Sequence, residues 1–355
     1  MGAITADDKF LLHLPMPLPK SFFTAVAERF PQLRIHYEVA PVVNHRLMNS
    51  DELPDEAWEG VTMLCVMPPP TPERMKNVKF VQLASAGSDL WIGHEAYTNK
   101  DITFCCTSGA HSVQIAEWAI GAWLAHAHNF RTFMAQQDEE DWDMKLSLSG
   151  TTTDSPGLRM GILGYGTIGR QVARLAHALG MEIYVQTFSP RPTPESKKLS
   201  EYHVPGTSDP DGLLPAKWFS GSGPEAVNHF LSQDLDVVLL SLPMNPQTKG
   251  CIGAEQFKIL GKKKPFLINV ARGPIVNTPA LVEALETGLL RGAALDVTDP
   301  EPLPKGHPLW KAPNVFITPH ISWQSSRLTE RIAAIILENL ERWDKGEPLL
   351  NRVKR

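Results

Sequence analysis

Short apolar runs alternate with stretches of helical spacing over residues 9–120. The apolar runs fall at 10–14, 34–39, 61–66, 80–83 and 102–106. Runs of this length without polar alternation are typical of parallel strands that are buried on both faces. Helical stretches such as 21–30 and 72–77 separate them. The pattern predicts a first domain of about five strand–helix units that form an open α/β sheet.

The apolar run at 158–163 leads through three glycines directly into a helical stretch. The glycines are spaced G-x-G-x-x-G. The first allows a tight turn, the second lets phosphates approach the backbone, and the third lets the helix pack close to the strand. Free N–H groups of the first helical turn then face the anion. The stretch predicts a dinucleotide site, with a purely structural turn as the alternative. The predicted contacts are Gly164, Gly166, Thr167, Ile168 and Gly169.

A second series of strands and helices continues to the end of the chain. Apolar runs follow at 182–187, 236–243, 266–270, 293–297 and 314–318, with helical stretches at 255–260 and 279–287. A long apolar helix at 113–128 is suited to connect two domains, and the amphipathic stretch 325–345 is able to pack back on the first. We expect an α/β chain of two doubly wound parallel sheets with a ligand cleft between them. They are a flavodoxin-like catalytic domain, 1–124 plus 323–355, and a Rossmann NAD(P)-binding domain, 125–322.

Two connections have no single interpretation. The turn at 84–89 contains a glycine and can aim backbone N–H groups at a small anion, but a simple loop explains it equally well. The segment 192–224 is rich in Pro, Gly, Ser and Asp and is long for a connection within a compact sheet. A lid, an oligomer contact and a surface excursion all fit its composition.

Three strands of the second domain each deliver one polar residue just past the carboxyl end. These residues are Arg272, Glu301 and His320. Arginine offers two parallel charge-assisted hydrogen bonds to a carboxylate. Histidine is suited to proton transfer near neutral pH, and a carboxylate beside it would orient the ring and favour its protonated form. Each residue alone fits a surface charge or a loop position, but three at successive strand ends predict hydride transfer to a 2-keto acid.

The end of the strand at 182–187 bears on the choice of cofactor. NAD-binding folds usually carry a carboxylate there for the ribose hydroxyls, whereas this chain has Thr187, followed by Ser189 and Arg191. Small hydroxyls and a guanidinium would hold a 2′-phosphate that a carboxylate would repel. We therefore expect NADP(H) rather than NAD(H), with NAD(H) possible if Arg191 is only a solvated loop residue.

Composition narrows the class of protein. The 355 residues suggest two domains, and 43% apolar with 21% charged residues is ordinary for a globular protein. The net charge of −5 gives no electrostatic reason to expect nucleic acid or an anionic membrane as partner. The four cysteines lack metal-ligand spacing, and Cys105 and Cys106 are expected to be buried thiols in a reducing compartment. With no leader and no apolar run of membrane-spanning length in this sequence, we expect the cytoplasm.

In these motifs the chain resembles the D-isomer-specific 2-hydroxyacid dehydrogenase family, in its glyoxylate/hydroxypyruvate reductase-like branch. The matching pieces are 161–170, 241–250, 268–276, 294–297 with 301–302, and 317–320, and the loop at 86–87 and the helix at 115–118 extend the likeness into the first domain. The family's arginine, glutamate and histidine fall on Arg272, Glu301 and His320. The resemblance also implies that Asp296 and the Ala271 carbonyl hold the nicotinamide carboxamide.

The remaining site residues are likewise implied by the resemblance. Cofactor contacts are expected from Leu242, Pro243, Thr248 and Val270, in addition to Arg272 and His320. Substrate contacts are expected from Ser85, Ala86, Gly87, Arg272 and Trp323, with backbone amides of the 85–87 loop binding the substrate carboxylate. The chain departs from the family's pattern at Thr187, at Ser322, where a glycine is common, and in the length of 192–224.

The resemblance implies an NAD(P)H-dependent oxidoreductase that reduces a small 2-keto acid, such as glyoxylate or hydroxypyruvate, to the D-2-hydroxy acid. Glu301, rather than glutamine, argues against the related formate dehydrogenases. A homodimer is expected, with the helix at 113–128 as a candidate contact. Two alternatives stay open: a dinucleotide-sensing protein similar to transcriptional corepressors, and a dehydrogenase of a different donor such as phosphite.

Overall fold

The computed structural model describes residues 2–43, 46–144 and 150–354. Contacts within the chain divide it into two compact units. The first contains the chain up to His111, the short segment Ser200–Val204 and the chain from Ser325 onward, and the second contains Ser112–Leu199 and Pro205–Gln324. These contacts place the boundary between the units just before the long apolar helix that was expected at 113–128. The sequence had suggested a boundary near the end of that helix. The predicted domain limits at 124 and 322 stay a prediction.

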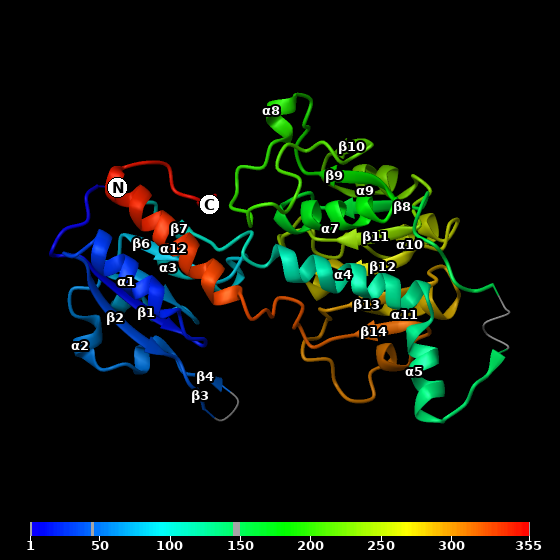
Figure 1. Cartoon of the computed structure of the whole chain (residues 1–355), viewed down its shortest axis with the longest axis horizontal. Helices are drawn as coiled ribbons and strands as arrows, with labels where there is room; N and C mark the ends of the chain where they lie inside the picture. Colours follow the sequence, from blue (N-terminus) through cyan, green and yellow to red (C-terminus); the bar gives the residue numbers. More distant parts are fainter. Residues whose placement is uncertain (1, 44–45, 145–149, 355) are drawn as a thin grey trace. The chain divides into compact units, whose positions relative to one another are not determined.

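The sheet of the first unit has five parallel strands in the order β2-β1-β5-β6-β7 (Figure 1). They are β1 (Lys9–Leu14), β2 (Arg34–Val39), β5 (Met63–Val66), β6 (Phe80–Gln82) and β7 (Thr103–Cys105). This is the doubly wound order of flavodoxin-like folds, and it confirms the predicted fold class for this half of the chain. The prediction that every strand is buried was wrong for β2, whose side chains are exposed or half-buried, because it lies at the sheet edge with one neighbour.

Helices cover both faces of this sheet. One face packs on α1 (Lys20–Arg29) and α12 (Leu328–Lys345), where Trp343 lies 5.3 Å from Phe80 between ring centroids. The other face is covered by a cluster of buried apolar residues from the short elements of the unit. These elements are α2 (Asp55–Trp58), η2 (Pro72–Met75), η3 (Asp89–Trp91) and α3 (Glu95–Thr98). The unit also contains η1 (Ser50–Glu52) and the antiparallel pair of β3 (Val42–Val43) and β4 (Arg46–Leu47).

The second unit contains a seven-stranded parallel sheet in the order β10-β9-β8-β11-β12-β13-β14 (Figure 1). The strands are β8 (Arg159–Leu163), β9 (Glu182–Thr187), β10 (Lys217–Ser220), β11 (Val237–Leu240), β12 (Phe266–Asn269), β13 (Gly292–Leu295) and β14 (Val315–Ile317). The order reverses between β8 and β11, which is the point where doubly wound sheets bind ligands. The predicted Rossmann topology is confirmed.

Alternate residues of the central strands enter two separate cores of this unit. Val237 and Leu239 point to the core shared with α4 (Ser112–Ala127) and α7 (Thr167–Ala178). Val238 and Leu240 point to the opposite core, which is completed by helices on the other face. Those helices are α9 (Pro224–Leu231), α10 (Ala254–Leu260) and α11 (Thr278–Glu286). Within the described residues, the remaining elements of this unit are α5 (Phe130–Asp138), α8 (Pro194–Lys197), η4 (Gly273–Ile275) and η5 (Pro308–Lys311).

The segment 192–224 is not one surface excursion. Its last part forms the edge strand β10, which pairs with β9 from Lys217 to Ser220. Its middle part, Ser200–Val204, belongs to the first unit, where the Tyr202 N–H donates to Asn351 Oδ1 at 3.1 Å. Mixed polarity concealed the strand in the sequence, because an edge strand keeps only part of its surface in the core.

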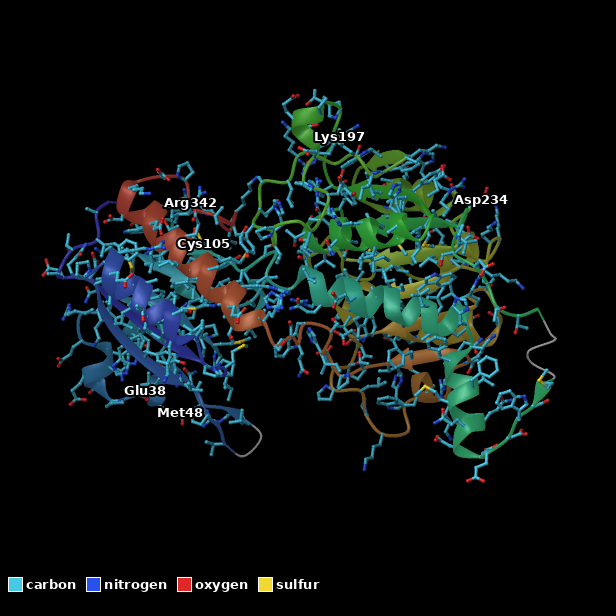
Figure 2. The ribbon with its side chains drawn as sticks, in the orientation of Figure 1. Glu38, Met48, Cys105, Lys197, Asp234 and Arg342 are labelled. Carbon is cyan, nitrogen blue, oxygen red and sulfur yellow. The ribbon has the colours of Figure 1, made fainter. Side chains whose placement is uncertain are left out.

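The four cysteines are unpaired, and all lie within the described residues. Cys65 and Cys105 are buried, and Figure 2 shows Cys105 inside the first unit. Burial raises the pKa of both thiols to about 12. The expectation of burial was wrong for Cys106, which is half-buried. Among the described residues, no helix has both the length and the apolar character needed to cross a membrane.

Candidate active site

The glycine turn after β8 has one tight side and one open side. Gly164 has φ +96°, and a Cβ there would lie 2.6 Å from the Ser241 carbonyl oxygen. A Cβ on Gly169, in the first turn of α7, would lie 2.3 Å from the Gly164 carbonyl oxygen. A Cβ on Gly166 would instead meet nothing within 4 Å. The first and third glycines are therefore required by packing, and the second leaves an open approach to the backbone.

This open side fits a dinucleotide pyrophosphate. Gly166 is the N-cap of α7, and no side chain of the described residues caps this end of the helix. Thr167 and Ile168 begin the helix at its positive end, where backbone N–H groups favour an anion. The turn lies between β8 and β11, at the reversal of the strand order. The residues present are thus those that a bound nicotinamide dinucleotide needs for its phosphates.

The loop after β11 also lies at this edge of the sheet. Leu242 is half-buried and Pro243 is exposed. The Thr248 hydroxyl donates to the Pro243 carbonyl oxygen at 2.8 Å and accepts from the Asn245 N–H at 2.9 Å. Their predicted contacts to the cofactor stay a prediction.

The end of β9 presents hydroxyls and one guanidinium. Thr187 Oγ1 donates to the Ser189 carbonyl oxygen at 2.8 Å. Arg191 is exposed, and its Nη1 donates to the Ser196 carbonyl oxygen at 2.6 Å. The short helix α8 follows, and a capping box between Thr193 and Ser196 caps its N-terminus. The structure therefore gives the arginine a fixed local anchor near the end of the strand.

Arg272, Glu301 and His320 follow three strands that are neighbours in the sheet. Arg272 comes after β12, Glu301 after β13 and His320 after β14. Because the strands are parallel, all three residues lie at one edge of the sheet. Gly273 brings the first two loops into contact, since a Cβ there would lie 1.9 Å from the Thr298 carbonyl oxygen.

His320 and Glu301 form a hydrogen-bonded pair. The imidazole Nδ1 lies 2.7 Å from Glu301 Oε1, with the two side chains 40% and 42% exposed. The other carboxylate oxygen accepts the Thr298 N–H at 3.4 Å. Nε2 of His320 has no hydrogen-bond partner within the described residues, so this nitrogen is available to a ligand. A carboxylate on Nδ1 fixes the orientation of the ring.

Arg272 lies beside the predicted carboxamide acceptor. Its Nη1 donates to the Ala271 carbonyl oxygen at 2.7 Å. Val270 and Ala271 are buried, whereas Arg272 is half-buried. The side chain of Asn269 holds this turn, because its Oδ1 accepts the Ala271 N–H at 3.0 Å. Asn269 was missed as a site residue, although it lies within one of the quoted family motifs.

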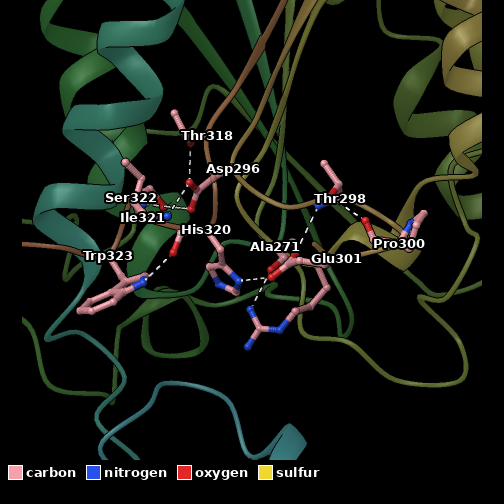
Figure 3. A network of polar contacts seen from close by, with 11 residues as sticks. Ala271, Asp296, Thr298, Pro300, Glu301, Thr318, His320, Ile321, Ser322 and Trp323 are labelled. Carbon is pink, nitrogen blue, oxygen red and sulfur yellow. Dashed lines mark hydrogen bonds and ion pairs between the residues drawn. The ribbon is translucent and has the colours of Figure 1, made fainter. Parts of the chain in front are cut away.

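Asp296 organises the loop that carries His320 (Figure 3). Its carboxylate is 2% exposed and accepts from Thr318, Ile321 and Ser322. The indole Nε1 of Trp323 donates to the His320 carbonyl oxygen at 2.7 Å. Sequence reasoning missed Thr318, whose only signal was its place before Pro-His in the strand-end motif.

The predicted substrate loop belongs to the first unit, after β6. The Ser85 hydroxyl donates to the Gly87 carbonyl oxygen at 2.6 Å, and the Thr107 N–H donates to the Ser85 carbonyl oxygen at 3.0 Å. Ala86 is exposed at the tip. The predicted catalytic and nicotinamide residues therefore share the second unit, whereas the 85–87 loop is part of the first, and its contact with substrate stays a prediction.

Comparisons with known proteins agree with this architecture. The family model described as D-isomer specific 2-hydroxyacid dehydrogenase, NAD binding domain, matches residues 120–215 and 221–322. A glyoxylate reductase from Thermofilum pendens is 27% identical over 94% of this chain and 93% of its own length. A glycerate dehydrogenase from Methylorubrum extorquens is 28% identical over 78% of this chain and 80% of its own.

A solved structure shows the same fold. It is a D-isomer specific 2-hydroxyacid dehydrogenase from Xanthobacter autotrophicus Py2 in complex with NADPH and MES, with 27% identity, 98% coverage of each chain and a TM-score of 0.72. The matched residues contain the glycine turn and the three strand ends that carry Arg272, Glu301 and His320. From the sheet order, the glycine turn and these matches, we conclude that the chain belongs to the D-isomer specific 2-hydroxyacid dehydrogenase family and binds a nicotinamide dinucleotide.

Proposed function

We propose that this enzyme reduces a small 2-keto acid to the D-2-hydroxy acid with NAD(P)H. The observation that carries the proposal is the His320–Glu301 pair, with 2.7 Å between Nδ1 and Oε1. His320 follows β14 and Glu301 follows the neighbouring strand β13, which in turn lies beside β12, the strand before Arg272. A proton donor, its supporting carboxylate and a guanidinium thus share the sheet edge onto which the dinucleotide turn opens. These are the groups that reduction of a keto acid requires.

The roles of the side chains follow from their chemistry. The bound dinucleotide supplies the hydride. Arg272 offers its guanidinium to the substrate carboxylate through parallel charge-assisted hydrogen bonds. His320 donates a proton from Nε2 to the carbonyl oxygen, and Glu301 on Nδ1 stabilises the imidazolium before the transfer. In the direction of oxidation, the imidazole of His320 is neutral and its Nε2 accepts the proton of the substrate hydroxyl.

The proposed substrate is a small 2-keto acid such as glyoxylate or hydroxypyruvate. Relatives that carry the names glyoxylate reductase and glycerate dehydrogenase support this substrate class. Ser85, Ala86 and Gly87 are proposed to bind the substrate carboxylate through backbone N–H groups.

We also propose that NADPH is preferred over NADH. No carboxylate stands at the end of β9, where Thr187 and Ser189 offer small groups and Arg191 a guanidinium. The similar solved structure from Xanthobacter was obtained with NADPH. Thr187→Asp is expected to raise KM for NADPH much more than KM for NADH, because a carboxylate repels the 2′-phosphate. Equal changes in the two KM values would contradict the assignment.

The function is tested by following NADPH and NADH absorbance with glyoxylate, hydroxypyruvate and bulkier 2-keto acids. Wild type is expected to turn over the small acids, and Arg272→Ala is expected to lose about 10²- to 10³-fold in kcat/KM, because one transition-state hydrogen-bond donor contributes about 2.7–4 kcal/mol. His320→Ala serves as the second inactive control. Tight cofactor binding without turnover of any keto acid would favour a dinucleotide-sensing protein or a different donor.

A homodimer is proposed as the assembly. Helix α5 buries none of its residues, and Phe130, Phe133 and Met134 on it are 52%, 37% and 65% exposed. Exposed apolar side chains gathered on one helix are typical of a surface that another chain covers. Light scattering during size-exclusion chromatography is expected to give twice the 39.3 kDa of the single chain, and a monomer would contradict the assignment.

A further inference from the structure

We propose that Arg170 is a positioning residue for cofactor choice, because its buried guanidinium holds the helix that anchors Arg191 against the glycine turn. The inference rests on the proposed preference for NADPH and deepens it. Arg191 offers the guanidinium for the 2′-phosphate, and Arg170 fixes the place from which Arg191 does so. Part of the segment 192–224, which the sequence left without a single interpretation, thereby receives a role.

The guanidinium of Arg170 is buried and donates to three backbone carbonyl oxygens. Arg170 lies near the start of α7 and is 2% exposed. Its Nε donates to Tyr165 at 3.3 Å, its Nη1 to Asp209 at 2.5 Å and its Nη2 to Lys197 at 2.6 Å. A guanidinium withdrawn from water needs such partners, and its planar fork can bind several of them at once. One side chain therefore joins the glycine turn to two separate parts of the connection between β9 and β10.

Lys197 links Arg170 to Arg191. Lys197 is the last residue of α8 and is labelled in Figure 2. The carbonyl oxygen of Ser196, one residue earlier in α8, accepts Nη1 of Arg191 at 2.6 Å. The other donors of the Arg191 guanidinium have no partner within the described residues, so they are available to a phosphate. Two successive carbonyl groups of α8 thus bind the two arginines, and a shift of α8 moves Arg191 with it.

Asp209 binds the glycine turn a second time. Its carboxylate accepts the Tyr165 hydroxyl at 2.6 Å and the Leu213 N–H at 3.0 Å. Tyr165 and Asp209 are 6% and 5% exposed. Burial and the hydrogen bond to Asp209 raise the pKa of Tyr165 above its usual value, so its hydroxyl stays a donor. The Arg170 guanidinium also lies over the Tyr165 ring, 4.7 Å from its centroid. The turn and the connection therefore share one network of buried polar groups.

The returning part of the connection packs directly on α8. The Leu199 N–H donates to the Pro210 carbonyl oxygen at 2.8 Å. Gly212 has φ +68°, and a Cβ there would lie 2.6 Å from the Lys197 carbonyl oxygen. This is the same oxygen that accepts Nη2 of Arg170. The position of α8 is consequently set by contacts with α7 and with the returning chain.

Cofactor choice separates this positioning role from a general loss of structure. NADPH and NADH present the same pyrophosphate to the glycine turn and differ in the 2′-phosphate. A displaced turn would therefore weaken both cofactors equally. A displaced α8 moves Arg191 and weakens NADPH alone, because guanidinium contacts to a phosphate need a fixed geometry. The ratio of the two Kd values is the quantity that a merely structural role would leave unchanged.

The test measures the Kd for NADPH and for NADH by fluorescence titration of the full chain. Arg170→Lys keeps the charge but loses the fork that binds three carbonyl oxygens. We expect its Kd for NADPH to rise about 10-fold, as for the loss of one hydrogen bond to a charged group, and its Kd for NADH to stay within about 2-fold of wild type. Tyr165→Phe removes only the hydroxyl bound to Asp209, and we expect a rise of about 3-fold for NADPH alone.

Arg159→Lys is the matched control. Nη1 of Arg159 also donates to a carbonyl oxygen at 2.6 Å, that of Gln233. Arg159 is the first residue of β8, however, and the glycine turn follows the last residue of that strand. This variant is expected to keep both Kd values of wild type. Equal losses for NADPH and NADH in Arg170→Lys and Tyr165→Phe would reduce the network to a structural role and overturn the proposal.

A double variant tests whether Arg170 acts through Arg191. Arg191→Ala removes the proposed phosphate contact and is expected to lower the preference for NADPH. Adding Arg170→Lys to Arg191→Ala is then expected to leave the ratio of the two Kd values unchanged, because the residue that Arg170 positions is absent. A further change in the ratio, as large as that in the wild-type background, would show independent action and overturn the proposal.

Two outcomes separate this inference from the proposed preference for NADPH. If Arg191→Ala abolishes the preference whereas Arg170→Lys and Tyr165→Phe keep it, the inference fails alone. If wild type binds both cofactors equally, the proposed preference fails. Hydrogen exchange of the 194–199 amides in the free enzyme then tests whether Arg170 positions α8. Arg170→Lys is expected to speed this exchange and Arg159→Lys is not, and unchanged exchange in Arg170→Lys would overturn the inference.

Discussion

Gly166→Ala is expected to weaken cofactor binding and to leave the fold nearly unchanged. The backbone of Gly166 is extended, at φ −87°, a conformation that any residue adopts. A methyl group there meets no atom of the chain within 4 Å. The only cost to the free protein is the poorer N-cap preference of alanine, which is about 1 kcal/mol at most. The open space in front of Gly166 is instead where we expect the pyrophosphate to approach the backbone.

Gly164→Ala provides the comparison for the loss of stability that an added methyl group can cause in this turn. Gly164→Ala combines a positive φ of +96° with a Cβ placed 2.6 Å from the Ser241 carbonyl oxygen. The backbone strain costs about 1–3 kcal/mol and the overlap a similar amount, so we expect a loss of at least about 2 kcal/mol. For a domain of this size the loss lowers the melting temperature by roughly 4–8 °C. Gly166→Ala is expected to shift it by roughly half of that or less.

The assay measures two quantities for each variant. Thermal unfolding without cofactor reports stability, and fluorescence titration with NADPH reports the Kd. In Gly166→Ala the added methyl overlaps the phosphates, so the Kd is expected to rise about 5- to 150-fold, which corresponds to about 1–3 kcal/mol. Wild-type affinity in Gly166→Ala would refute the reasoning, because the phosphates would then not lie against this backbone. If Gly166→Ala lowered the melting temperature as much as Gly164→Ala, the inference that the space beside Gly166 is open would be wrong.

Three other predictions concern packing and pH. Gly273→Ala is expected to lower kcat by about 100-fold, because its methyl would push the Arg272 loop away from Thr298, and wild-type kinetics would contradict this. Burial lowers the pKa of His111 from 6.5 to about 4, so the neutral ring is favoured by folding and stability is lost as pH falls below 6.5. Between pH 7 and 5 the loss is about 2 kcal/mol in urea unfolding, and His111→Gln should remove that slope. Asn339→Leu is expected to lower the free energy of unfolding by about 1–3 kcal/mol, because the buried Asn339 Nδ2 donates to Gln82 Oε1 at 2.7 Å and the variant leaves that acceptor unsatisfied. An unchanged urea midpoint would contradict this.

The sequence alone determined the two parallel sheets, the glycine turn and the strand ends that carry Arg272, Glu301 and His320. These features depend on local patterns: apolar runs of strand length, helical spacing and residues at fixed distances from a strand end. The doubly wound class followed from topology rules, because parallel strands joined by helices form few arrangements, whereas the strand order came from the structure. Most predicted strands and helices consequently lie within a few residues of their bounds in the structure.

Tertiary structure alone decided what is not local. The edge strand β10 was hidden because its side chains are only half-buried, so Trp218 and Phe219 gave no apolar run. The partners of Asp296 lie up to 26 residues away along the chain, and no spacing rule connects them. The left-handed backbone of His320 is likewise imposed by these distant hydrogen bonds. A sequence states which donors and acceptors are present, whereas only the fold decides which of them are already satisfied before a ligand binds.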